Sequence, residues 1–508
     1  MNAMPVQVPI STRRFIVLAV VAMVSLGTFV LSSLASLNQN DFMYAVAPAV
    51  WAQNGALYTD VPYPQAPLSI LLNSSLAAIG RNVNIFLPAR ILSMVLVLLA
   101  VLLPVLNRTR MRNIEIWILY VALCLTNFFV VSNSREIGNY ALSLLCLSAA
   151  ITVVMSRGSA TWRGFAAFAF LGLATSAKLY FVVLFPALLL FFLINDRKGR
   201  EFAVIVTCVL GLLLGLAPVL FFLARDHQAF WQWTIRFFQL IMPFRLAGAA
   251  DAFRQTVHML VLFATLMAIP LGFLVVAMWN AWRRGDDDLR EKSAQLLLLA
   301  GASAMAVSPI ILFGQYFGPL AFLLLLFSAP WNLPDGQTRF LYRVFAGALL
   351  CIQCIVMAAI IGPDISRDAS VAVAEVLKVQ TSARTLVQNG YHCERRLYTT
   401  VPLFLLENDI KYPSELAAGP FLMFFLRGAA LVQKREAFDL DAHIKKWNPD
   451  IVIWGYFLGS HDAAEDEVDR SIRDYAVGRN FVIASIGNVD GHDIKFAYRA
   501  GCRDALKR

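Results

Sequence analysis

The chain has 508 residues, of which 59% are hydrophobic and only 15% are charged, and its mean hydropathy is +0.65. Soluble domains carry about 25% charged residues, so the composition excludes a wholly soluble protein. The formal net charge of +10 lies mainly in short loops between apolar runs, which argues against nucleic-acid binding.

Long apolar runs fill the chain between Phe15 and Gly362. A helix needs about 20 apolar residues to cross a bilayer, and these continuous runs lack the period-two alternation of barrel strands. The first run is too long for a signal-peptide core and is interpreted as a retained helix. About eleven spans are predicted, at approximately 15–37, 85–106, 114–131, 140–155, 164–177, 179–194, 202–224, 256–282, 294–313, 316–329 and 340–362.

Basic residues in the connecting loops predict the orientation of these spans. Alternate loops hold sixteen Lys and Arg residues on one side and seven on the other. The richer side is expected to be cytoplasmic. The N-terminus is then cytoplasmic, and residues 363–508 lie on the periplasmic side of a bacterial-type inner membrane.

The first outer loop, residues 38–84, contains apolar stretches at 41–53 and 67–79, each followed by a glycine. Glycine commonly lies just past a helix end, and Pro67 suits a first helical position. Both stretches are short for a span, so they are expected to be interfacial helices.

The second outer loop, residues 225–255, carries aromatic side chains among arginines. Such a pattern is typical of an aromatic belt at headgroup level. The expected belt residues are Trp231, Trp233, Phe237 and Phe238.

The composition becomes more polar after Pro363. Short strands are predicted at 396–400, 451–454, 481–485 and 494–498, with helices at 366–389, 439–447 and 464–477. Alternating strands and helices favour a small α/β layer. The predicted organisation is a transmembrane domain over 1–362 and a periplasmic α/β domain over 363–508.

Only two of the seven cysteines, Cys393 and Cys502, lie in this C-terminal segment. An oxidising compartment would permit a disulfide between them.

Asp41 follows the first span within Asn-Gln-Asn-Asp-Phe-Met-Tyr. A carboxylate at the membrane boundary could act as a general base on an acceptor hydroxyl or help to hold a divalent cation. The alternative is an N-cap, for which Asp is a favoured residue.

The residues after Asp41 form a recognisable series, in which Tyr44 precedes Gly-Ala-Leu-Tyr58-Thr-Asp60 and Tyr63-Pro-Gln-Ala-Pro-Leu. This series resembles the first outer loop of GT-C-fold glycosyltransferases, in particular the protein O-mannosyltransferase-like and lipid A aminoarabinose or galacturonic acid transferase-like group. The resemblance implies a GT-C-like arrangement over about 10–330, with Asp41 as catalytic base. It places Tyr44, Tyr58, Asp60 and Tyr63 among the expected substrate-binding residues.

The second short outer loop, Ser-Asn-Ser-Arg135-Glu136-Ile-Gly-Asn139, lies where that family often has another acidic residue. Arg135 is expected to assist at a donor phosphate, and Glu136 and Asn139 to contact substrate. The commoner Asp of the family is absent, and the Arg–Glu pair could equally be a local ion pair.

Lys178, in Ala-Lys178-Leu-Tyr-Phe, resembles the Lys-aromatic element of the family. A lysine between apolar helices is unfavourable unless it is paired or near water, and its ammonium suits a phosphate. A snorkelling lysine is the alternative. Arg90 could contact the same phosphate or fix the first outer loop, and a structural tie to a neighbouring helix is an equal alternative. Tyr316 matches an outer Tyr-x-x-Pro element loosely.

The sequence therefore predicts a glycosyltransferase that moves a sugar from a polyprenyl-phosphate donor to a lipid or glycan acceptor, with inversion at the anomeric carbon. Lipopolysaccharide and lipid A are candidate acceptors. No cofactor is indicated beyond a divalent cation that could bind Asp41. A transporter or flippase for a lipid-linked glycan is the main alternative, and it predicts internal repeats and broken helices at the midplane. An assembly protein that docks through its C-terminal segment is a third.

Overall fold

A computed structural model describes most of the chain. The described residues are 12–35, 44, 47–48, 51, 56–59, 61, 63–79, 86–106, 114–156, 158–195, 201–237, 239, 249–283, 314–328, 336–365, 369–388, 391–399, 410–413, 439–456, 463–489 and 491–502.

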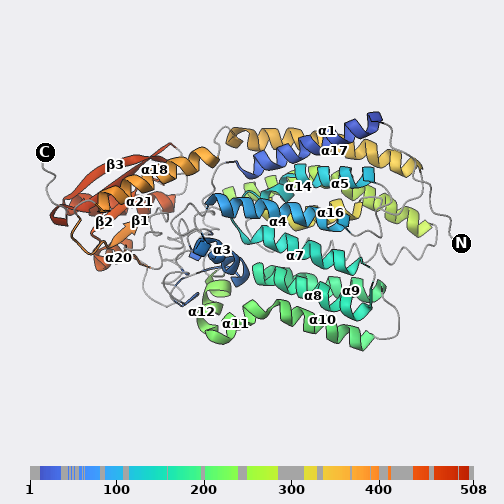
Figure 1. Cartoon of the computed structure of the whole chain (residues 1–508), viewed down its shortest axis with the longest axis horizontal. Helices are drawn as coiled ribbons and strands as arrows, with labels where there is room; N and C mark the ends of the chain where they lie inside the picture. Colours follow the sequence, from blue (N-terminus) through green and yellow to red (C-terminus); the bar gives the residue numbers. More distant parts are fainter. Residues whose placement is uncertain are drawn as a thin grey trace.

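Helices fill ten of the predicted apolar runs, while the run at 294–313 lies outside the described residues (Figure 1). The helices of this region are α1 (Thr12–Ser33), α3 (Pro67–Ile79), α4 (Phe86–Leu106), α5 (Ile114–Thr126), α6 (Phe128–Ser132), α7 (Asn139–Val154), α8 (Ala160–Ala177), the 3-10 helix η2 (Leu179–Val183), α9 (Leu184–Asn195), α10 (Glu201–Gly215), α11 (Ala217–Arg225), α12 (His227–Trp231), the π-helix η3 (Gln232–Arg236), α14 (Ala249–Arg283), α16 (Gly314–Ser328) and α17 (Gly336–Ile365).

Three helices in the described part of the chain are long and apolar enough to cross a membrane individually, namely those over Thr12–Ser33, Phe86–Val105 and Phe340–Ile360. A fourth candidate is the pair Phe202–Gly215 and Ala217–Arg225, whose two halves are bent by 59°. Other apolar helices are shorter. The expected number of about eleven spans therefore stays a prediction.

Polar residues stand at two points where the apolar helices are interrupted. The side chain of Asn127 accepts hydrogen bonds from the N–H groups of Phe129 and Val130, so α5 ends and α6 begins there. Asparagine favours such caps because its carbonyl competes for backbone donors. Likewise, Lys178 adopts an extended conformation between α8 and η2.

Glycines of α10 allow the backbones of α8 and α10 to pack closely together. A Cβ atom on Gly211 would lie 2.1 Å from the carbonyl oxygen of Phe165, and one on Gly215 would lie 2.1 Å from that of Ala169. Small residues allow backbones to approach closely in membrane helix pairs. This contact fixes α8, whose last turn precedes Lys178, so the glycines of α10 indirectly position the lysine.

We expect Gly211→Val to destabilise the helical region by about 3 kcal/mol or more, because backbone atoms of α8 cannot make way as a side chain could. Thermal unfolding of the purified protein measures the effect. Gly272→Val is the matched control, since a Cβ there meets nothing within 4 Å. Equal unfolding temperatures for both variants would contradict this account of the packing.

The C-terminal elements form a four-stranded sheet covered by helices at one end of the bundle (Figure 1). Its strand order is β1-β2-β4-β3, in which β1 and β2 are parallel and the other pairs are antiparallel. The elements are α18 (Ala369–Gln388), β1 (Leu397–Thr399), α20 (Leu440–Trp447), β2 (Ile451–Trp454), α21 (Ala463–Gly478), β3 (Phe481–Val489), β4 (His492–Arg499) and the 3-10 helix η6 (Ala500–Cys502).

The bundle end beside the sheet also carries α3, α11 and α12 (Figure 1). Buried residues there form one apolar cluster that extends from Tyr44 and Phe86 into the sheet. The first outer loop, the second outer loop and the C-terminal segment are thus packed together at the same end of the bundle.

The aromatic residues of the second outer loop differ from the expected belt. Trp231 is 55% exposed, but Trp233 is only 8% exposed and Phe237 is also buried. Both buried rings belong to the apolar cluster beneath the loops, with their centroids 6.0 Å apart. The belt interpretation was wrong for these two because the loop folds back on the first outer loop; Phe238 lies outside the described residues.

Candidate functional site

Lys178 lies at the end of α8, where the helix stops against the first outer loop. Its backbone N–H still donates to the carbonyl of Ala174, but its extended conformation turns the chain into η2. The side chain is 8% exposed, so its charge is largely removed from solvent. Such a position is unfavourable for an ammonium without compensating groups.

Aromatic rings and an amide surround the Lys178 ammonium. Its Nζ lies 2.8 Å from Gln65 Oε1, to which it donates, and 4.4 Å from the centre of the Tyr140 ring. The rings of Tyr180 and Tyr316 are each 5.9 Å away. Cation–π contacts of this kind stabilise a desolvated cation by about 2 kcal/mol or less each. These four contacts, which all come from neutral groups, help to hold the ammonium in place.

Asn139, the first residue of α7, contacts the same amide. Its Nδ2 donates to Gln65 Oε1 at 2.9 Å, and the residue is completely buried. The other side-chain atom, Oδ1, is buried and has no hydrogen-bond partner among the residues that the structure describes. Buried polar atoms are normally paired, so this acceptor is suited to a donor group from a ligand or water.

Glu136 and Tyr44 lie next to this group. Gln315 Nε2 donates to Glu136 Oε2 at 3.5 Å, and both residues are buried. Burial raises the pKa of Tyr44 well above its usual value, and the nearby side chains of Tyr63 and Glu136 raise it further. Tyr44 is therefore a neutral phenol, close to Glu136 and to the tyrosines around Lys178.

Arg90 connects α4 to the end of α1. It is 1% exposed, and its Nη1 donates to the carbonyl oxygens of Ser33 at 3.1 Å and Ala35 at 3.4 Å. These carbonyls lie at and just after the last residue of α1, where helix carbonyls lack partners within the helix. The contacts fit a tie to a neighbouring helix, while a role of Arg90 at the donor phosphate stays a prediction.

Tyr58 and Tyr63 stabilise the first outer loop from inside. Tyr58 Oη donates to the backbone oxygen of Gln65 at 2.7 Å, and Tyr63 Oη lies 3.2 Å from Ser69 Oγ. Both rings are at most 1% exposed. Both residues stabilise the shape of the loop, and their role as substrate-binding residues stays a prediction.

The two outer loops are joined at Asp226. Thr59 Oγ1 donates to Asp226 Oδ2 at 3.1 Å, while Asp226 Oδ1 accepts from the N–H of Ala229 and caps α12. The hydrogen bond from Ala229 is the main cause of the lowered pKa of Asp226. The ring of Tyr58 also contacts Phe230 of α12 with centroids 5.1 Å apart.

The structure brings together some of the predicted site residues. Lys178, Asn139 and Tyr316 share contacts, and Tyr44 and Glu136 are adjacent to them. Arg135 is half-buried in the loop before α7. Asp41 and Asp60 lie outside the described residues.

Sequence reasoning missed three residues of this group, Gln65, Tyr140 and Gln315. A glutamine in an outer loop has no unusual chemistry by itself. For Tyr140 there was a signal, because it directly follows the polar residue Asn139 at the start of an apolar run. Gln315 is likewise polar at the start of such a run.

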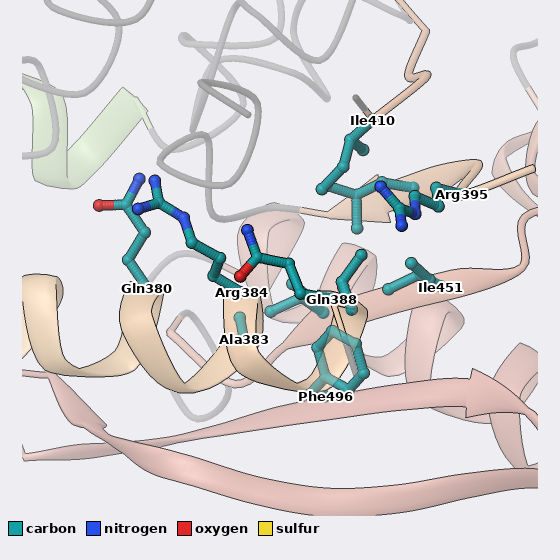
Figure 2. A pocket seen from close by; sticks show the side chains of 11 residues that line it. Gln380, Ala383, Arg384, Gln388, Arg395, Ile410, Ile451 and Phe496 are labelled. Atoms are coloured by element: carbon teal, nitrogen blue, oxygen red, sulfur yellow. The ribbon is translucent and has the colours of Figure 1, made fainter. Parts of the chain in front are cut away.

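A small hollow lies in the C-terminal segment, between α18 and the sheet (Figure 2). Arg384 and Gln388 of α18 and Arg395 line it above an apolar floor that includes Ile451 and Phe496. Its volume is about 30 Å³. Ligand pockets usually measure about 300–1,000 Å³, whereas one water needs about 10–15 Å³. The hollow is therefore too small for a sugar.

Cys393, Cys502 and Asp450 bring three metal-ligand atoms within 4.8 Å of one another. The two sulfurs, however, form a disulfide, with the Cα atoms 5.1 Å apart. Thiolates are the metal-binding form of cysteine, so this group does not have the donors of a metal site.

The architecture resembles that of solved membrane proteins. ArnT from Cupriavidus metallidurans in the apo state matches with a TM-score of 0.55 at 12% identity, over 97% of this chain and 99% of that chain. The same protein bound to undecaprenyl phosphate matches with a TM-score of 0.54 at 12% identity, over 98% and 100%. The chain has the GT-C fold of membrane glycosyltransferases.

Other comparisons add little to this fold. An Archaeoglobus fulgidus oligosaccharyltransferase tethered with an acceptor peptide has a TM-score of 0.49 at 12% identity, over 90% of this chain and 71% of that chain. No family model and no curated protein matches the sequence. The likeness therefore concerns the fold, as the sequence motifs of the first outer loop predicted.

Proposed function

We propose that the chain is a glycosyltransferase that takes a sugar from a polyprenyl-phosphate donor and transfers it to a lipid or glycan acceptor at the periplasmic face of the inner membrane. The buried Lys178 ammonium carries this proposal, because it follows the last residue of α8 and contacts Gln65 of the first outer loop. Its fixed charge suits a phosphate delivered at the bilayer surface. A neighbour of the same fold has been crystallised with undecaprenyl phosphate, which supports this class of donor.

In the proposed reaction, the Asp41 carboxylate accepts the proton of the acceptor hydroxyl. The acceptor oxygen attacks the anomeric carbon and forms the new glycosidic bond. The bond between that carbon and the phosphate oxygen breaks, and polyprenyl phosphate leaves with the electron pair. Lys178 stabilises the charge that develops on this oxygen. A single displacement inverts the anomeric configuration.

The residues around Lys178 would form the rest of the site. Asn139 Oδ1 could accept a hydrogen bond from a sugar hydroxyl, since it is buried, shares Gln65 with the ammonium and has no partner in the described part of the chain. Glu136 and Tyr44 would line the same region. A divalent cation at Asp41 is compatible with this scheme but is not required by it.

A transporter is less favoured by the arrangement of these polar groups. Transporter sites usually lie near the bilayer midplane, at broken helices. Here Lys178 follows the last residue of α8 and Asn139 is the first residue of α7, so both lie at helix ends beside the outer loops.

Asp41→Asn tests the proposal in cells. We expect the variant to fold and insert but to lose transfer by about 100-fold or more, because an amide cannot accept the acceptor proton. Mass spectrometry of surface glycolipids would show one sugar mass missing, as in cells without the protein. Near-normal transfer by Asp41→Asn would show that the assigned base is wrong. An unchanged glycolipid profile in cells without the protein would overturn this acceptor class.

A further inference from the structure

Gln65 occupies a point where three segments of the chain meet. Its Oε1 accepts hydrogen bonds from Lys178 Nζ at 2.8 Å and from Asn139 Nδ2 at 2.9 Å. Both neighbours are donors, so the atom between them must be the amide oxygen. The contact connects the first outer loop to the end of α8 and the start of α7.

The backbone around Gln65 is held firmly. Its carbonyl oxygen accepts from Tyr58 Oη, and Tyr58 is buried against Phe222 and Phe230. Tyr58 has a positive φ of 72°, which is unfavourable for a residue with a side chain. Such a conformation persists where surrounding contacts enforce it. The loop therefore presents the Gln65 side chain from a fixed backbone.

We infer that Gln65 is the positioning residue of the donor site, which fixes the Lys178 ammonium and the Asn139 amide so that they recognise the phosphate and an adjacent hydroxyl of one ligand. This inference rests on the proposed function, because it assigns the phosphate to Lys178. Gln65 itself does not touch the reacting atoms in this scheme. It acts by orienting the two groups that do.

A glutamine suits this task better than a glutamate. A neutral amide oxygen can accept from an ammonium without cancelling its positive charge. A carboxylate at the same place would accept the same two hydrogen bonds but would form an ion pair with the lysine and compete with a phosphate. The neutral side chain of Gln65 therefore orients the lysine without adding a negative charge beside it.

Binding of undecaprenyl phosphate to the purified full chain in lipid nanodiscs tests the inference, with undecaprenol as the lipid that lacks the phosphate. We expect Gln65→Ala to weaken binding of undecaprenyl phosphate about tenfold, as is typical for loss of a hydrogen bond to a charged group. Binding of undecaprenol should not change. Thr59→Ala, which removes a hydrogen bond from the same loop away from Lys178, is the matched control and should bind both lipids normally.

A double-mutant cycle separates positioning from a general loop effect. If Gln65 acts through Lys178, Gln65→Ala should cause a smaller loss in a Lys178→Met background than in the unmodified protein, because only the contact with Asn139 is then left to lose. An equal loss in both backgrounds would overturn the inference. If Lys178→Met weakens binding but Gln65→Ala does not, the positioning role is wrong while the proposed donor site stands. If Lys178→Met itself has no effect, the phosphate assignment fails, and the inference with it.

Gln65→Glu provides a second variant in case Gln65→Ala does not fold. It retains acceptors for both donors, so we expect normal folding but binding of undecaprenyl phosphate weakened by tenfold or more. The loss should diminish at acidic pH as the introduced carboxyl becomes protonated. Binding equal to the unmodified protein at neutral pH would contradict the role of the neutral amide.

Discussion

Replacing Lys178 with methionine is expected to lower the rate of sugar transfer per folded molecule by about 100- to 1,000-fold, as is typical when one preorganised group that stabilises developing charge is removed. The ammonium is buried and oriented before the donor arrives, by Gln65 and by the Tyr140 ring. Little reorganisation is therefore needed when charge develops on the departing phosphate oxygen. Methionine keeps a comparable unbranched side chain without the charge.

The matched control is Arg163→Met, a loss of charge near the opposite end of the same helix. Arg163 lies in the first turn of α8, and its Nη1 donates to the carbonyl oxygens of Val154 and Ser156 at the end of α7 and just after it. We expect this variant to lose stability but to retain its rate per folded molecule. Transfer is measured as sugar incorporated into surface glycolipid, divided by the amount of folded protein in the membrane.

The same measurement distinguishes a Lys178 that stabilises the departing phosphate from a lysine that only snorkels. A lysine that only snorkels stabilises the helix end and contributes nothing to chemistry. In that case Lys178→Met would reduce the amount of folded protein but leave the rate per molecule intact. A rate within a factor of about three of the unmodified protein would contradict the electrostatic role, since such a factor corresponds to less than 1 kcal/mol.

The sequence predicts most helices and strands of this chain because their patterns are local. Pro67 is the first residue of α3, as its preference for that position predicts. Strand β3 extends to Val489, beyond the predicted end at Ser485, because a bulge between Ser485 and Gly487 interrupts its alternation. The bend between α10 and α11 was missed since both halves are apolar, although Pro218 marks the new helix start.

The candidate site could be predicted only in part. Lys178 and Asn139 are conspicuous because they interrupt or begin apolar runs, where polar groups are unfavourable. Gln65 is not, because its importance depends on partners 74 and 113 positions away. The contacts of Arg90 with the end of α1 likewise depend on the tertiary structure. The same is true of Trp233, which packs into the apolar cluster that extends from Tyr44 and Phe86 into the sheet.

Loss of the disulfide is expected to have the largest effect on stability. Cys393 and Cys502 are bonded across 109 positions, and the bond connects the segment before β1 to the end of the sheet. In the chain-entropy account, closing a loop of this size stabilises the folded state by about 4–5 kcal/mol, and observed losses are typically about 2–5 kcal/mol. We expect Cys393→Ser with Cys502→Ser to lower the unfolding temperature of the C-terminal elements by several degrees.

The same bond tests the predicted orientation of the C-terminal segment. Disulfides persist outside the cytoplasm and are rare within it. When protein is taken from native membranes with its free thiols blocked, Cys393 and Cys502 should therefore react with a second thiol reagent, and gain its mass, only after reduction. A reductant should lower the unfolding temperature of the unmodified protein and of the control Cys351→Ser, whose thiol is free, but should not affect the double variant. If Cys393 and Cys502 are both blocked before reduction, the C-terminal segment lies in a reducing compartment. The proposed site would then lie on the wrong face of the membrane for a periplasmic transferase.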